Sequence, residues 1–175
     1  MSLSLLREFC AENFTDVPAA IEAGADRIEL CDNLAVGGTT PSAGVIGAAT
    51  VYAHEHGARV MTMIRPRGGD FVYGPAELQM MQSDIETACR LGTDGIVFGC
   101  LERREHGFWL DLSAIETLVA RVRWMQDQRD WSGIPREFDR EDQRIDITFH
   151  MAFDELSPED QFEAIDVLVK MGVTR

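Results

Sequence analysis

Five short apolar runs recur along the chain, and each is followed by a stretch that could form a helix. The runs are rich in β-branched and large apolar residues, as strands are, and they lie at 5–10, 27–31, 59–64, 95–98 and 145–149. A strand that is followed by a helix and then by another strand is the repeating unit of a parallel sheet. The sequence therefore predicts an α/β fold built from five βα units.

Residues that favour helix starts support this reading. Ser42 is placed to cap a helix that runs to about His56, and Pro75 suits the first turn of a helix that ends near Gly92. Ser157 and Pro158 open the last helix in the same way. The repeating unit is thus marked by capping chemistry as well as by periodicity.

Repeated βα units form an open doubly wound sheet or a closed eight-stranded barrel. The first strand lacks the glycine-rich fingerprint of a dinucleotide-binding fold, which favours the barrel. Because five strands cannot close a barrel of eight, we expect one TIM-barrel-type domain over 1–175, truncated after about five βα units. A polar segment at about 124–143, with Gly133 and Pro135, is expected to be an insertion.

Charge and composition limit the partners. The 30 acidic and 16 basic residues give a formal net charge of −14, which repels a nucleic-acid backbone. The chain has no signal-peptide pattern and no run of about 18 apolar residues, so we expect a cytoplasmic protein with no membrane partner. Its four cysteines are expected to be free thiols. An open sheet edge could be covered by self-association, which makes a homo-oligomer a further expectation.

Several segments resemble the CutC copper homeostasis family. The most specific is MIRPRGGDF at 63–71, and the others, in chain order, are EFCAEN at 8–13, AGADRIELC at 23–31, GGTTPS at 37–42, LGTDGIVFG at 91–99 and TFHMAFD at 148–154. The resemblance implies a TIM-barrel fold and a role in copper handling. In the last segment Met151 stands where the family pattern has an arginine.

Two cysteines are candidate metal ligands. Functional groups of βα barrels lie at the carboxyl ends of the strands, and Cys10 and Cys31 end the first two predicted strands. Neighbouring strands are about 4.8 Å apart, so the two thiolates can approach one ion. Thiolate ligands suit Cu(I), which makes copper the predicted cofactor and partner. The alternative is that both cysteines only pack in the core.

Charged residues at the same strand ends offer a different function. If Glu8, Glu29, Arg65, His150 and Asp154 converge, they could act as the acid/base cluster of a lyase or isomerase with a small anionic substrate. An anion could also be held by Arg65 and Arg67 with the backbone of Gly68 and Gly69. The competing interpretation is a structural network of ion pairs.

Overall fold

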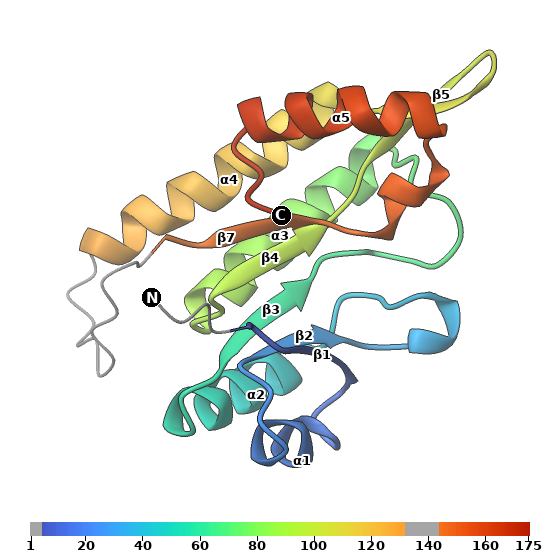
Figure 1. Cartoon of the computed structure of the whole chain (residues 1–175). Coiled ribbons are helices and arrows are strands. Elements are labelled where there is room, and N and C mark those ends of the chain that lie inside the picture. The colour runs from blue at the N-terminus through green and yellow to red at the C-terminus, as the bar shows by residue number, and fades with distance from the viewer. Residues whose placement is uncertain (1–4, 132–143) are drawn as a thin grey trace.

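The five predicted strands lie side by side in chain order in the computed structural model, which describes residues 5–131 and 144–175 (Figure 1). All four neighbouring pairs are parallel. The strands, in the order of the sheet, are β1 (Glu8–Glu12), β2 (Arg27–Cys31), β3 (Arg59–Met63), β4 (Gly95–Phe98) and β7 (Asp146–Phe149). The predicted α/β fold with a five-stranded parallel sheet is therefore confirmed.

Helices connect the strands, and three of them begin where the sequence predicts. The five α-helices are α1 (Val17–Glu22), α2 (Ala43–Glu55), α3 (Pro75–Arg90), α4 (Leu112–Trp131) and α5 (Pro158–Lys170). The Ser42 hydroxyl accepts a hydrogen bond from the backbone N–H of Val45, and Ser157 caps α5 in the same way. No helix in the described part of the chain is long and apolar enough to cross a membrane.

The two faces of the sheet have different partners. Residues at alternate positions, such as Ile28, Val60 and Ile96, belong to a large apolar core that they share with the helices. The opposite face carries a smaller buried cluster of Cys31, Met61, Met63 and Val97. The helices thus cover one face, and the other face bears the sulfur-containing side chains.

The strand β4 approaches its neighbours closely because glycine begins it and follows its end. A Cβ atom on Gly95 would lie 2.6 Å from the sulfur of Met61, and one on Gly99 would lie 2.6 Å from Nδ1 of His150. Real Cβ atoms essentially never come that near to another heavy atom. Side chains from β3 and from the end of β7 therefore fill the space that β4 leaves open.

The structure differs from the sequence expectations in three places. The first strand spans 8–12 rather than 5–10. Two unpredicted strands, β5 (Leu101–Arg104) and β6 (Gly107–Leu110), form an antiparallel hairpin after β4. Helix α4 continues to Trp131, so the first part of the expected insertion is helical, and the rest, 132–143, lies outside the described residues.

The described strands form an open sheet rather than a closed barrel. Strand β1 is one edge, and β7 is the last strand on the other side. Beyond β7 the backbone of Thr174 donates to the carbonyl of Ile147, and Arg175 accepts from Phe149, each at 2.8 Å. The hydrogen-bonded ladder thus extends past β7 to the last residues of the chain. Short 3₁₀ turns, η1 (Leu34–Val36) and η2 (Met151–Glu155), follow β2 and β7.

Candidate functional site

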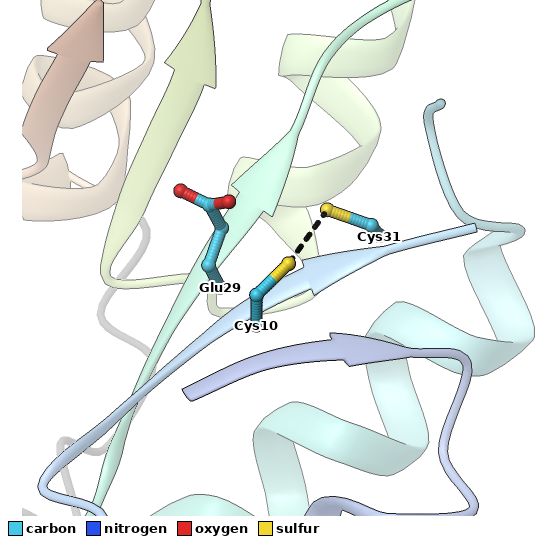
Figure 2. A group of neighbouring side chains, drawn as sticks. All are labelled: Cys10, Glu29 and Cys31. Carbon is cyan, nitrogen blue, oxygen red and sulfur yellow. Dashed lines mark hydrogen bonds between the residues drawn. The ribbon is translucent and has the colours of Figure 1, made fainter. Parts of the chain in front are cut away.

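Cys10, Glu29 and Cys31 form a compact group on β1 and β2 (Figure 2). The two sulfur atoms are 3.9 Å apart, and one oxygen of Glu29 completes a set of three atoms that all lie within 4.8 Å of one another. The register pairs Cys10 with Glu29 and places Cys31 one pleat further along β2. Cys31 is buried and Cys10 is exposed, so solvent reaches the group from the β1 side.

The protons of this group are coupled. The hydrogen bond from the Cys31 thiol lowers the pKa of Cys10, whereas the same bond and burial raise the pKa of Cys31. Burial, followed by the charge of Glu8, raises the pKa of Glu29. Glu8 itself forms an ion pair with the buried guanidinium of Arg27. Cys10 is therefore the first thiol to ionise, with Cys31 donating to it.

The dimensions of the group suit one metal ion. With a metal–sulfur bond of about 2.3 Å, taken from zinc sites as a scale, two sulfurs on a shared ion are at most about 4.6 Å apart. The observed 3.9 Å falls inside that limit. Two sulfurs favour a soft ion, and the carboxylate of Glu29 adds a hard oxygen ligand beside them.

Gly38 leaves space for the Cys31 sulfur. Its backbone has a φ of +86°, which L side chains rarely adopt, and an added Cβ would lie 3.2 Å from the Cys31 sulfur. The sequence segment GGTTPS thus places a glycine directly against a candidate ligand. Met63 shares a buried cluster with Cys31.

Arg65 lies just beyond the end of β3 and is 2% exposed. Its Nη1 donates to the carbonyls of Val36 and Gly38, and its Nη2 donates to that of Gly69. The remaining nitrogen, Nε, is buried without a partner, and no carboxylate forms an ion pair with Arg65 in the described part of the chain. A buried cation therefore rests on neutral groups, three backbone carbonyls and the Phe71 ring.

His150 follows β7 and packs against the same Phe71 ring as Arg65. The guanidinium carbon of Arg65 is 4.7 Å from the centre of that ring, and the centre of the His150 ring is 5.0 Å from it. Nδ1 of His150 accepts from the backbone N–H of Ala152, and Nε2 is buried without a partner. Burial, and then the charge of Arg65, lower the pKa of His150 to about 3, so the ring is neutral near pH 7.

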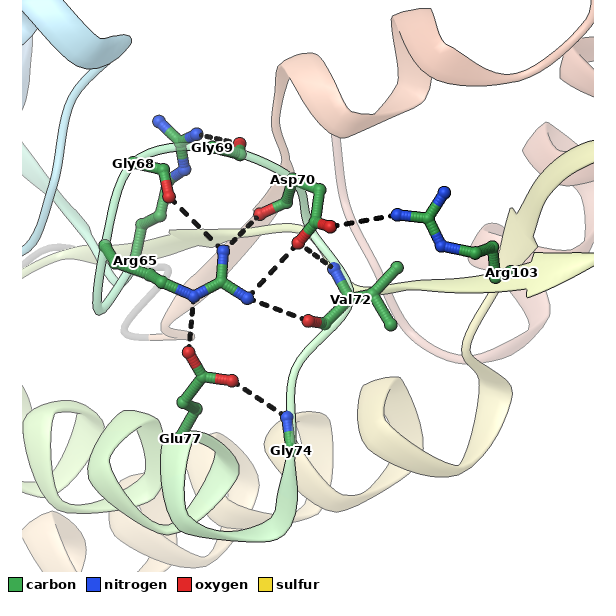
Figure 3. Close-up of polar contacts among 9 residues, drawn as sticks. Arg65, Gly68, Gly69, Asp70, Val72, Gly74, Glu77 and Arg103 are labelled. Carbon is green, nitrogen blue, oxygen red and sulfur yellow. Dashed lines mark hydrogen bonds and ion pairs between the residues drawn. The ribbon is translucent and has the colours of Figure 1, made fainter.

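Arg67 has a different role from Arg65, since its donors hold the loop that follows β3. Figure 3 labels residues that accept from it, among them Asp70, Val72 and Glu77. Its Nε donates to Glu77 at 2.5 Å. Its other nitrogens donate to the carbonyls of Gly68, Asp70 and Val72 and to the Asp70 carboxylate. To bind an anion, as the sequence suggested, Arg67 would have to exchange one of these contacts.

The five residues of the predicted acid/base cluster fall into separate groups. Glu8 and Glu29 lie beside the cysteines, Arg65 and His150 contact Phe71, and Asp154 is exposed on η2. Of the other cysteines, Cys89 and Cys100 are buried in the large core.

Sequence reasoning did not single out Tyr73 or Phe71 as site residues. Tyr73 is buried, and its hydroxyl has no hydrogen-bond partner. Burial raises its pKa to about 12, although the nearby charge of Arg65 acts in the opposite direction. Phe71 ends the MIRPRGGDF segment, and Tyr73 follows two residues later. The signal available in the sequence was the spacing of these two aromatic residues, which stand two positions apart shortly after Arg65 and Arg67.

Comparison with known proteins identifies close relatives. A model of the CutC family matches residues 5–126. A CutC family protein of Enterococcus faecalis is 53% identical over 171 residues, which cover 98% of this chain and 71% of that protein. The human copper homeostasis protein cutC homolog is 36% identical over 170 residues, which cover 97% of this chain and 52% of that protein.

Solved structures agree with these matches. The crystal structure of a CutC protein from Streptococcus agalactiae matches with a TM-score of 0.81 and 45% identity, over 98% of this chain and 71% of that one. A 2,3-dimethylmalate lyase of the PEP mutase/isocitrate lyase superfamily matches with a TM-score of 0.58, over 97% of this chain and 55% of the lyase. At 12% identity this second match concerns the fold alone.

Proposed function

This chain belongs to the CutC family, and we propose that it serves copper homeostasis in the cytoplasm by binding Cu(I) between the thiolates of Cys10 and Cys31. One observation carries the proposal: two sulfurs from neighbouring strands lie 3.9 Å apart, already within the span of a single ion. The cytoplasm keeps thiols reduced, as this chemistry requires.

The order in which Cys10 and Cys31 lose their protons determines how Cu(I) binds. Cys10 is exposed and has the lower pKa, so its thiolate is the first ligand that an arriving ion meets. Cys31 must then lose its proton, because only a thiolate is a strong ligand. Glu29 lies within 4.8 Å of both sulfurs and its pKa is raised, which suits it to accept that proton. Cu(I) uptake therefore displaces the thiol protons from sulfur, and Glu29 keeps the one that leaves Cys31.

The test is an anaerobic titration of the reduced protein with Cu(I) against a competing chelator. We expect one ion per chain in the wild type and loss of competitive binding in the Cys10→Ser/Cys31→Ser double variant. The matched control is the Cys89→Ala/Cys100→Ala double variant, which removes the two buried core thiols and leaves the pair intact. Equal affinity in the wild type and the serine variant would refute the proposal.

Glu29 provides a second, graded test. Its replacement by glutamine removes the negative charge and the proton acceptor but keeps the shape of the side chain. Partners beside metal ligands commonly change affinity by about 10- to 100-fold, and we expect a loss of that size in Glu29→Gln. More protons should reach the buffer for each Cu(I) bound, because the proton of Cys31 no longer stays on residue 29, and calorimetry in two buffers of different ionisation enthalpy measures this.

A further inference from the structure

Three buried polar atoms without partners occur close together at the strand ends. They are Nε of Arg65, the hydroxyl of Tyr73 and Nε2 of His150. Their residues are 2%, 8% and 8% exposed. More than about 90% of buried polar groups in native proteins are hydrogen-bonded. Three exceptions in one place therefore call for an explanation.

Shared neighbours place the three side chains together. The Phe71 ring contacts both Arg65 and His150, with 4.7 Å from its centre to the guanidinium carbon and 5.0 Å to the imidazole centre. The charge of Arg65 acts on the Tyr73 hydroxyl and on the His150 ring, lowering the pKa of each. The three unused atoms thus belong to one electrostatic environment.

All three atoms can donate a hydrogen bond. Nε of Arg65 always carries a proton. Nδ1 of His150 accepts from Ala152, so in the neutral ring the proton is on Nε2. The Tyr73 hydroxyl can rotate to donate. The group has one full positive charge, and no ion pair compensates it in the described residues. Three donors around a buried cation complement an oxyanion.

We propose that Arg65, Tyr73 and His150 form a binding site for the single oxyanion group, carboxylate or phosphate, of a small molecule. This site uses none of the proposed copper ligands, although Gly38 touches both groups: its carbonyl accepts from Arg65, and its Cβ position lies 3.2 Å from the Cys31 sulfur. Arg67 is not part of it, because its donors are already used within the loop. His150 acts here as a neutral donor rather than as a base.

The surroundings offer an entrance and space for the rest of the ligand. Met151 is exposed. A Cβ atom on Gly37 would lie 3.2 Å from the Met151 sulfur and 3.1 Å from Nη1 of Arg65, so Met151 and Arg65 are neighbours at Gly37. An unbranched methionine side chain can rotate aside easily. A cavity of about 250 Å³ lies next to the donors: Gly69 and Phe71, which both contact Arg65, line it, whereas Arg65, Tyr73 and His150 themselves do not.

The acidic part of that cavity restricts the ligand. Asp70 and Glu155 also line it, and their carboxylates would repel a second anionic group. The ligand class is therefore a small molecule with one anionic group and a neutral or basic remainder.

The experiment measures anion binding to the metal-free, reduced chain by calorimetry and by thermal unfolding. Inorganic phosphate and acetate are the probes, and sodium chloride at equal ionic strength is the reference. We expect at least one probe to raise the melting temperature beyond the chloride reference. Tighter phosphate binding would assign the site to phosphate compounds, and tighter acetate binding would assign it to carboxylates. The proposal is overturned if neither probe exceeds chloride.

Tyr73→Phe is the decisive variant, because it removes only the hydroxyl, which lies beside the Arg65 side chain and has no other side-chain partner in the described part of the chain. The unliganded variant should be at least as stable as the wild type, whereas its affinity for the bound probe should fall about ten- to a hundredfold. The matched control is Tyr52→Phe at the only other tyrosine, on α2. Wild-type affinity in Tyr73→Phe would contradict the proposal, and so would an equal loss in Tyr52→Phe.

His150→Asn tests a second donor. Asparagine can still accept from the backbone N–H of Ala152 but lacks a donor at the place of Nε2. We expect a loss of affinity comparable to that in Tyr73→Phe. The Cys10→Ser/Cys31→Ser variant should bind the probe like the wild type, so failure of the copper proposal would leave this result unchanged.

Discussion

Burial of neutral His150 should make the stability of the fold depend on pH. The pKa of this imidazole is about 3 in the folded chain against 6.5 for a free side chain. Because the folded pKa is depressed, the unfolded chain binds a proton first as the pH falls below 6.5. Stability is then lost at about 1.4 kcal/mol per pH unit until the folded pKa is reached. Integrated from pH 6.5, where the unfolded imidazole is half protonated, to pH 4.5, the loss is about 2.3 kcal/mol.

Urea unfolding of the wild type and His150→Asn between pH 7 and pH 4.5 measures this loss. Asparagine does not titrate, so the difference in unfolding free energy between the two proteins should change by about 2–3 kcal/mol across that range. The control is His106→Asn, since the His106 side chain is 91% exposed. Phosphate and acetate are left out of the buffers, because an anion beside Arg65 would favour protonated His150. Parallel pH profiles for the wild type and His150→Asn would refute the reasoning.

Three further predictions concern the loops and caps. Arg67→Gln should destabilise the fold by about 1–3 kcal/mol in urea unfolding, because Arg67 holds several loop carbonyls. The control is Arg103→Gln, which breaks an exposed ion pair and should cost less than about 1 kcal/mol. Ser42→Ala should cost about 1 kcal/mol in the same assay through loss of the α2 cap. Gly38→Ala should weaken Cu(I) binding in the chelator assay, because its Cβ would press on the Cys31 sulfur; unchanged affinity would contradict the assigned metal position.

The sequence predicted the elements whose signals are local. Strand β2, strand β4 and the starts of α2, α3 and α5 lie where the apolar runs, serines and prolines indicated. The approach of Cys10 to Cys31 could also be foreseen, because it requires only that two neighbouring parallel strands carry cysteines near their ends.

Other features depend on contacts that local patterns do not contain. The β5–β6 hairpin is rich in charged residues, and Arg103 and Arg104 stack on the rings of Phe108 and Trp109 across it. Alternating apolar residues, the usual strand signal, are weak there. Likewise, Arg65 and Arg67 are two residues apart in one segment, yet one has an unused donor and the other has none to spare. The path of the loop decides which of the two arginines keeps an unused donor.

The glycines of the LGTDGIVFG segment bear on how sequences of this fold can change over time. At position 95 the missing side chain gives its space to Met61, and at position 99 it gives its space to His150. A larger residue at either place therefore needs a smaller partner on the neighbouring strand. Positions 95 and 61 should vary together, as should 99 and 150. A chain that replaced Gly99 alone would displace the imidazole before it lost the fold.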